Sequence, residues 1–264
     1  MGNESISILS VKFEAKTKKE QLDKVKKRLD SGLTTKIFTP NPQIILNAVK
    51  DKKTLNLLKL SDINLPDGIG IALASSLLGK KLPERISGID FAQELLFLAA
   101  KHKYSVFLLG GKSGRAHKAR RALCQRIPNL KICGCHNGYF NKVGTDNERI
   151  KKIIQSSRPD FLFVCLGSPC QEKWIAENIS SFPSVKLAIG LGGSIDVWAG
   201  KIKRAPYILR KYGLEWLWRT VKEPRRAKIF IDIPKFLICV LAQRRASCKV
   251  QDARIVSNIR EKRY

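Results

Sequence analysis

A carboxylate on a tight turn is the first group in this sequence that could do acid–base chemistry. Asp67 lies between Pro66, which fixes the backbone before it, and Gly68, which frees the backbone after it. A single aspartate in such a turn most often caps a helix or closes an Asx-turn. The neighbouring motifs must therefore decide between that structural role and a chemical one.

Three glycine-rich turns, at residues 110–114, 167–171 and 190–194, each follow an apolar stretch. A P-loop is excluded because Val106 stands where its first glycine belongs, and a dinucleotide fingerprint is weakened because Ile195 replaces its last glycine. Backbone N–H groups at the starts of the following helices can still bind a pyrophosphate. The candidates are Gly110, Gly111 and Gly192. Alternatively, these glycines only permit tight turns.

Cys133, Cys135 and His136 lie close together and suggest zinc. Structural zinc sites need four ligands in paired spacing, and the sequence has neither a CxxC pair nor an HxxxH partner. We therefore expect no metal there. The seven cysteines, an odd number without paired spacing, are typical of a reducing compartment in which thiols fill the core.

The elements that must position these groups follow from the apolar pattern. We expect helices at 13–30 and 43–59, and strands at 34–38, 105–109, 161–166 and 185–189. Apolar strands that each lead into a turn and a helix predict an α/β fold with a Rossmann-like parallel sheet covered by helices on both faces, over residues 1–200. Ligands of such sheets bind beyond the carboxyl ends of the strands, where the glycine-rich turns lie.

The formal net charge of +28 points to a polyanionic partner, either nucleic acid or an anionic membrane. Residues 201–264 contain 18 Lys/Arg against 5 Asp/Glu. Residues 201–245 mix aromatic, aliphatic and basic side chains and predict a helical appendage for membrane interaction. Residues 246–264 form a basic tail without a convincing period, for which we expect disorder. No segment predicts a signal peptide or a spanning helix, so we expect a cytoplasmic, peripheral protein.

Eight separated motifs, in order between residues 31 and 226, resemble the WecG/TagA/CpsF family, glycosyltransferase family 26. They are Thr39-Pro40-Asn41-Pro42, LPDGIG with Asp67, PERISGID, FLLGGKSG, NGYF around Tyr139, LGSPCQEKW with Gln171, GGSIDVWAG, and RAP followed by GLEWLWR and EPRR. The resemblance implies an inverting enzyme that moves N-acetylmannosamine, its uronic acid or a related hexose. The implied donor is a UDP-sugar and the implied acceptor is an undecaprenyl-diphosphate-linked GlcNAc.

The same resemblance assigns roles to residues. Asp67 is the implied general base for the acceptor hydroxyl, and Thr39 and Asn41 would orient the sugar or the base. Gln171 would hydrogen-bond substrate hydroxyls, although it could instead cap its helix. Cys170, beside it, stands where relatives more often have a basic residue, which leaves the donor choice open.

The leaving diphosphate needs positive charge, and the sequence has no DxD triplet to hold a metal. We therefore expect neither metal nor cofactor, and arginines in their place. The candidates are Arg85, Arg204, Arg219, Arg225 and Arg226, each of which could also be a solvated surface charge. Self-association is a further expectation from the resemblance.

Two other functions compete with this one. A nucleic-acid-binding protein would explain the charge, with basic and aromatic residues interleaved over 212–226, but no recognition motif appears and we expect no nucleic acid partner. An inactive scaffold of a polysaccharide assembly complex is disfavoured by the intact Thr39, Asn41, Asp67 and Gln171.

Overall fold

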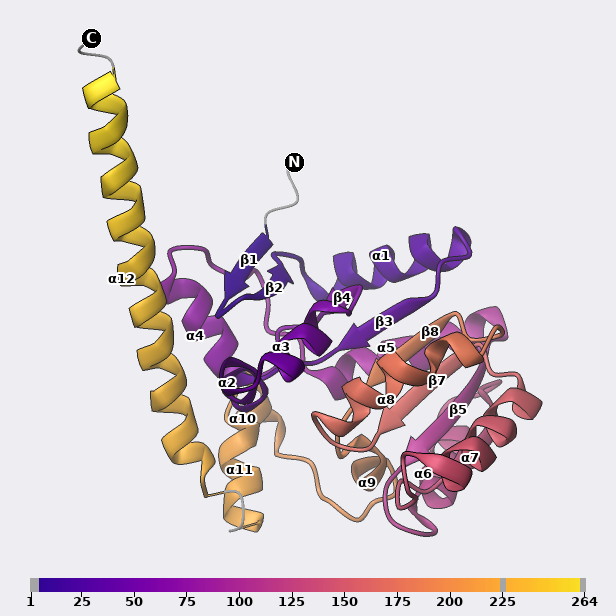
Figure 1. The fold of residues 1–264 in the computed structure, drawn as a ribbon. Helices are drawn as coiled ribbons and strands as arrows, with labels where there is room; N and C mark the ends of the chain where they lie inside the picture. The colour runs from indigo at the N-terminus through magenta and orange to yellow at the C-terminus, as the bar shows by residue number, and fades with distance from the viewer. Residues whose placement is uncertain (1–4, 224–226, 262–264) are drawn as a thin grey trace.

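A computed structural model describes the backbone of residues 5–223 and 227–261, and side chains within these ranges up to residue 246. Figure 1 shows a central sheet surrounded by helices, with one long helix standing along its side. Within the described residues the sheet has six strands in the order β4-β3-β8-β7-β5-β6, all parallel. The strands are β3 (Thr35–Phe38), β4 (Ile63–Asn64), β5 (Ser105–Gly110), β6 (Lys131–His136), β7 (Phe161–Cys165) and β8 (Leu187–Gly190).

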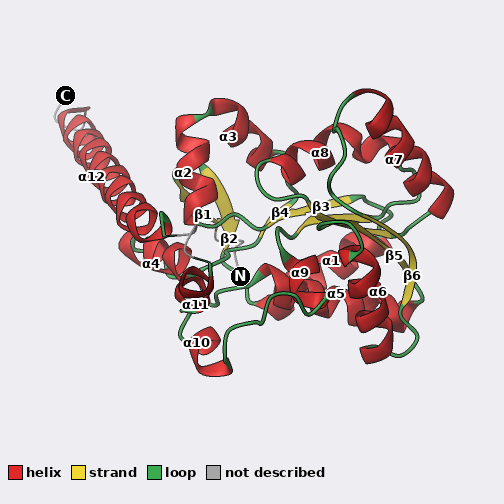
Figure 2. Cartoon of the chain, turned by 90° about the horizontal axis from the view of Figure 1, so that it is seen from below, coloured by secondary structure: helices red, strands yellow, loops and turns green. Residues whose placement is uncertain are grey.

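Helices cover both faces of this sheet, as Figure 2 shows. One face packs against α1 (Lys18–Asp30), α5 (Gly88–His102), α6 (Arg115–Arg126) and α9 (Ser194–Trp198). The other packs against α2 (Pro42–Lys50), α3 (Lys52–Lys59), α4 (Ile69–Leu77), α7 (Gly144–Ser157) and α8 (Cys170–Asn178). Because both faces are covered, strands β5, β7 and β8 are buried along their whole length. The predicted α/β class with a parallel sheet is confirmed.

Two predicted helices were too long. The first begins only at Lys18, where Thr17 and Glu20 form a capping box, because residues 11–14 alternate between buried and exposed positions as strand β2 (Val11–Glu14). That strand pairs with β1 (Ser5–Ile8) in an antiparallel hairpin that the sequence analysis missed. The second divides into α2 and α3 at Asp51, which ends one helix in an extended conformation and caps the next.

The chain after Gly200 is helical, as expected, but part of it is built into the core. It forms α10 (Tyr207–Lys211), α11 (Glu215–Lys222) and α12 (Ile229–Glu261), so the helix includes most of the tail for which we expected disorder. Phe236 and Val240 of α12 are fully buried, and this helix packs against α2 and α4. Gln243 also bonds the backbone of the β1–β2 hairpin at Ser7 and Leu9.

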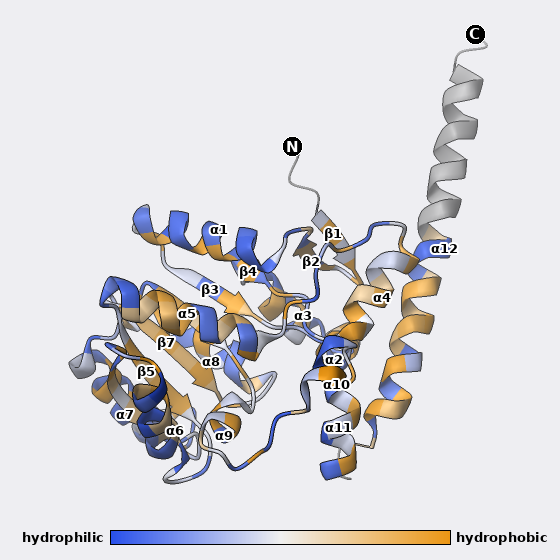
Figure 3. Ribbon diagram, turned by 180° about the vertical axis from the view of Figure 1, so that it is seen from behind, coloured by the Kyte–Doolittle hydropathy of each residue, from blue (hydrophilic) through white to orange (hydrophobic). Residues whose placement is uncertain are grey.

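No helix in the described part of the chain is long and apolar enough to cross a membrane. In Figure 3 much of the first half of α12 nevertheless has the colour of hydrophobic residues. Several of them are exposed, namely Phe230, Ile231, Ile238 and Leu241.

Candidate active site

Two hollows lie side by side at the carboxyl edge of the sheet. The first, which we call the Asp67 pocket, has a volume of about 180 Å³ and is lined by residues that follow β3, β4 and β8 and by α11 and α12. The second, the glycine cleft, has a volume of about 770 Å³ and is lined by the turns after β5, β6, β7 and β8. The sheet therefore brings the predicted carboxylate and glycine-rich turns to one edge, as the fold class requires.

Asp67 projects into its pocket from the turn after β4, and it is partly buried. Gly68 behind it has φ +87°, a conformation that favours glycine, and α4 begins at the next residue. Within the described residues no side chain forms a hydrogen bond or ion pair with the Asp67 carboxylate. The expected helix-capping role is absent, because α4 has no side-chain cap bond.

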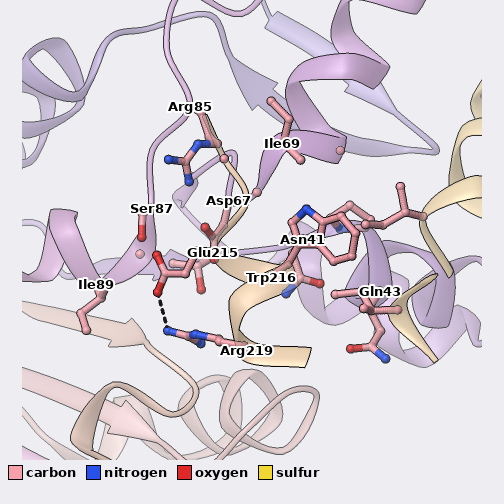
Figure 4. Close-up of a pocket in the computed structure, with 18 of the residues that line it drawn as sticks. Asn41, Gln43, Asp67, Ile69, Arg85, Ser87, Ile89, Glu215, Trp216 and Arg219 are labelled. Carbon is pink, nitrogen blue, oxygen red and sulfur yellow. Dashed lines mark hydrogen bonds and ion pairs between the residues drawn. The ribbon is translucent and has the colours of Figure 1, made fainter. Parts of the chain in front are cut away.

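Burial raises the pKa of Asp67 to about 6, although the charges of Arg219 and Arg85 act in the opposite direction. Figure 4 shows Arg85, Glu215 and Arg219 grouped around Asp67, while Trp216, Asn41 and Gln43 lie further along the pocket. A carboxylate with a pKa near 6 is still ionised at neutral pH and is a stronger base than an ordinary aspartate.

Thr39 and Asn41 follow β3 and line the same pocket, but both side chains also hold the backbone in place. The Thr39 hydroxyl donates to the carbonyl of Gly190 over 3.0 Å. The Asn41 side chain caps α2 by accepting from the N–H of Ile44 over 3.0 Å. The structure thus brings all three predicted catalytic residues into one pocket and gives two of them a structural task as well.

Gln171 does not line either hollow. It is 1% exposed, and its amide oxygen accepts a 2.8 Å hydrogen bond from the N–H of Gly192. Its amide nitrogen donates to the carboxylate of Glu172, which is also buried. Gln171 therefore shapes the turn after β8 from beneath and is not placed to contact a substrate directly.

The turn after β8 forms the wall between the two hollows. Leu191 and Ser194 line the Asp67 pocket, whereas Gly192 and Gly193 line the glycine cleft. Thr39 holds the start of this turn on the pocket side. Groups bound in the two hollows would therefore be separated only by the backbone of the four residues 191–194.

The predicted glycines have different positions. Gly192 and Gly111 line the cleft with φ +53° and +70°, and their N–H groups are bonded to Gln171 and to the carbonyl of Cys165. Gly110 is not in the lining, and a side chain there would collide with Cys165. None of these three glycines therefore presents a free N–H group to a ligand in the cleft. It offers close access to backbone, together with Lys112 and the 72% exposed Tyr139.

The five predicted arginines separate into three groups. Arg85 and Arg219 line the Asp67 pocket. Arg204 lies outside it, where it holds Asp90 through two bonds of 2.6 Å. Arg225 and Arg226 lie outside the described residues.

Among the pocket residues that sequence reasoning missed are Glu215, Trp216 and Asp232. The spacing of Glu215 and Arg219 was a usable signal, because residues four apart on a helix form ion pairs, and theirs measures 2.9 Å. Nothing local predicted that Asp232, bonded to Gln43 over 3.1 Å, would join the pocket from another helix. The described residues contain no group of three His, Cys, Asp or Glu side chains that could hold a metal ion.

Comparison with known proteins identifies the family of the chain. The model of the "Glycosyl transferase WecG/TagA/CpsF family" matches residues 6–249. A Bacillus subtilis strain 168 protein named N-acetylglucosaminyldiphosphoundecaprenol N-acetyl-beta-D-mannosaminyltransferase is 38% identical over 81% of this chain and 82% of its own length. A Staphylococcus aureus strain MRSA252 protein of the same name is 34% identical over 91% and 93%. The chain belongs to the WecG/TagA/CpsF family of glycosyl transferases.

Proposed function

We propose that this chain transfers N-acetylmannosamine, or a closely related hexose, from a UDP-sugar to a GlcNAc carried by undecaprenyl diphosphate, for cell-surface polysaccharide or teichoic acid synthesis. The names of its relatives supply the acceptor and the sugar. The arrangement of the two hollows supplies independent support. The observation that carries the proposal is the Asp67 carboxylate, which has no partner among the described side chains and a pKa near 6, at the edge where the sheet would bind its substrates.

We place the nucleotide donor in the glycine cleft. Its volume of about 770 Å³ suits a nucleotide sugar, and the glycine-lined backbone allows a diphosphate to approach closely. Tyr139 presents an exposed ring on which a base could stack, and Lys112 supplies positive charge at the mouth. The sugar would then lie against the turn after β8.

We place the acceptor in the Asp67 pocket, on the other side of that turn. Asp67 takes the proton from the attacking hydroxyl, whose oxygen forms the new bond to C1 of the donor sugar. The bond from C1 to the diphosphate breaks with its electron pair on the departing UDP. Attack opposite the leaving group inverts the configuration at C1 and gives a β-linkage from an α-linked donor.

Positive side chains line both hollows. Lys112 and Arg115 line the glycine cleft, where the donor diphosphate departs, and Arg85 and Arg219 line the Asp67 pocket, where they would bind the diphosphate of the acceptor. Guanidinium groups match phosphate oxygens in pairs, and a partly enclosed pocket makes their charge more effective than in water. The proposed step uses no metal and no cofactor, because these positively charged side chains take the place of a metal-bound clamp.

The acceptor is anchored in lipid, so the enzyme must work at a membrane surface. We propose peripheral binding to the cytoplasmic face through the exposed apolar residues of α12, with Lys235, Arg244 and Arg245 on the same helix for anionic lipid. Each basic residue near such a surface contributes about 1 kcal/mol. Self-association of the chain is part of the same proposal.

The test measures UDP release from a panel of UDP-sugars with a synthetic polyprenyl-diphosphate-GlcNAc acceptor. Asp67→Asn should lower the rate about 10²- to 10⁴-fold, because a positioned base contributes that much. Asp30→Asn, the same change on the exposed end of α1, is the matched control and should keep full activity. Acceptor-dependent release by Asp67→Asn at the wild-type rate would overturn the proposed base, and no release with any donor would overturn the substrates.

A further inference from the structure

A chain of four charged side chains links the core to the Asp67 pocket. Asp90, in the first turn of α5, accepts two bonds of 2.6 Å from Arg204, which lies between α9 and α10. Arg204 also approaches Glu215 of α11 at 3.7 Å, and Glu215 accepts a 2.9 Å bond from Arg219 one turn later. The signs alternate along the chain, so each inner member has an opposite charge on both sides.

Glu215 is one of the two inner members and the most buried of the four, with a side chain only 13% exposed. It lines the Asp67 pocket together with Arg219 and Asp67 itself. Figure 4 shows its carboxylate beside Asp67, with the dashed line running to Arg219. The carboxylates of Asp67 and Glu215 therefore share this pocket with the guanidinium of Arg219, which is bonded to Glu215.

This choice of partner matters for the chemistry. A guanidinium fork bonded to a carboxylate stabilises its charged form and lowers its basicity. If Arg219 paired with Asp67, it would occupy the lone pairs that must accept the proton. Glu215 holds Arg219 through an i, i+4 pair on the same helix, which needs little ordering of either side chain.

We propose that Glu215 is a positioning residue that keeps Arg219 off the Asp67 carboxylate and so leaves that carboxylate free to accept a proton. The inference rests on the proposed role of Asp67 as the base. It assigns to Glu215 a function in the reaction that the ion pair alone does not require.

The electrostatics of the pocket agree with this arrangement. Burial raises the pKa of Asp67 first, Arg219 and Arg85 lower it, and Glu215 and Asp90 raise it. Asp232 lines the same pocket from α12 and is bonded to Gln43. Removing the charge of Glu215 therefore takes away one group that raises the pKa of Asp67, and it frees Arg219 to lower that pKa further.

The test is the pH profile of kcat/KM for Glu215→Gln with the lipid-linked acceptor. The acid limb, near pH 6 in the wild type, should move about one pH unit lower, and the plateau rate should fall about tenfold because a weaker base transfers the proton less readily. Glu177→Gln, an exposed carboxylate on α8 paired with Lys173 at 3.8 Å, is the charge-matched control and should shift nothing.

Two further variants separate positioning from mere docking of α11. Arg204→Gln breaks the link to Asp90 but keeps the pair between Glu215 and Arg219, so it should weaken folding and leave the acid limb in place. Glu215→Asp keeps the charge but draws it back by one methylene, so it should give a smaller shift. This variant also serves as the measurement if Glu215→Gln does not fold, which thermal unfolding would show.

An acid limb that stays at the wild-type position in Glu215→Gln, or in Glu215→Asp if only that variant folds, would overturn the inference. If Asp67→Asn is inactive in the same assay, the proposed function survives that result. If Asp67→Asn is instead fully active, the base assignment itself fails. The two failures are therefore distinguishable.

Discussion

The amide oxygen of Gln171 accepts a 2.8 Å hydrogen bond from the backbone N–H of Gly192 and thereby connects the start of α8 to the wall between the two hollows. The bond is buried, since Gln171 is 1% exposed, and a side chain on Gly190 would collide with the same amide. The position of this wall relative to the sheet thus depends on a residue that reaches neither substrate site.

Replacing Gln171 by leucine should disturb donor binding more than acceptor binding. The change keeps the volume but leaves the N–H of Gly192 without its acceptor, at a cost of about 1–3 kcal/mol. Since Gly192 lines the glycine cleft, we expect the donor KM to rise about tenfold and the acceptor KM to change less than threefold. Initial-rate kinetics with each substrate varied in turn would show this.

Gln155→Leu is the control for that comparison. Gln155 donates from α7 to the carbonyl of Ser181 at the surface, so the same substitution there should leave both KM values unchanged. If Gln171→Leu raised the acceptor KM as much as the donor KM, the assignment of the donor to the glycine cleft would be wrong.

The contrast between Thr39 and Gln171 shows how far the sequence could lead. Both residues come from motifs that marked the correct edge of the sheet, because apolar strands followed by turns fix where the carboxyl ends lie. Whether each side chain faces a hollow or the backbone depends on turns that meet only in three dimensions. For this reason the sequence did not predict that Gln171 supports the turn after β8 or that Arg204 binds Asp90.

The sequence also did not predict the long-range contacts of the fold. The break at Asp51 is a local event, but nothing in the helical period at 43–59 distinguishes one bent helix from two. Asp232 enters the pocket because α12 packs against α2, and the sequence does not record that contact. Glu215 was the missed residue with a local signal, in its spacing from Arg219.

The raised pKa of Asp67 predicts a cost in stability at neutral pH. The folded chain binds this proton more tightly than the unfolded chain, whose carboxyl has a pKa near 3.8. The contribution of Asp67 to stability is therefore complete below about pH 4 and is lost as the pH rises through about 6. Asp67→Asn should be more stable than the wild type at pH 7.5, by on the order of 2–3 kcal/mol, and equally stable at pH 4.

Urea denaturation of both proteins at the two pH values measures this difference. Asp30→Asn, at an exposed site, should match the wild type at both. If the difference in the free energy of unfolding between Asp67→Asn and the wild type were the same at pH 7.5 as at pH 4, the pocket would not destabilise the carboxylate.

The fork between Arg204 and Asp90 should hold the segment between α9 and α10 against the start of α5. Burial opposes the ionisation of Asp90, but Arg204 lowers its pKa below the ordinary value. Arg204→Gln should therefore reduce the free energy of unfolding by about 1–3 kcal/mol at pH 7, less than for a fully buried pair because the Asp90 side chain is 39% exposed. The difference should narrow as the pH falls below about 4 and through the lowered pKa of Asp90 in the folded chain, because the carboxylate then takes up a proton and loses its ion pair with Arg204.

Arg204→Lys tests whether geometry or charge carries this effect. A lysine keeps the charge but cannot make both 2.6 Å bonds at once, so it should recover only part of the stability. Full recovery would mean that charge alone suffices and that the fork has no role of its own.

The exposed stripe on α12 should determine membrane binding. Ile238 is 64% exposed. It lies two helical turns after Ile231 and one turn before Leu241, and both of these side chains are also exposed. Ile238→Asp removes apolar area and adds a negative charge facing anionic lipid, so binding to vesicles rich in anionic lipid should weaken about tenfold in co-sedimentation. Val143→Asp, at an exposed site at the start of α7, carries the same kind of change at the far end of the molecule and should bind normally.

With a short, water-soluble acceptor both variants should keep the wild-type rate, because neither residue lines the Asp67 pocket or the glycine cleft. If Ile238→Asp bound vesicles as well as the wild type did, the membrane would have to meet another face, and the basic residues outside α12 would become the ones to change.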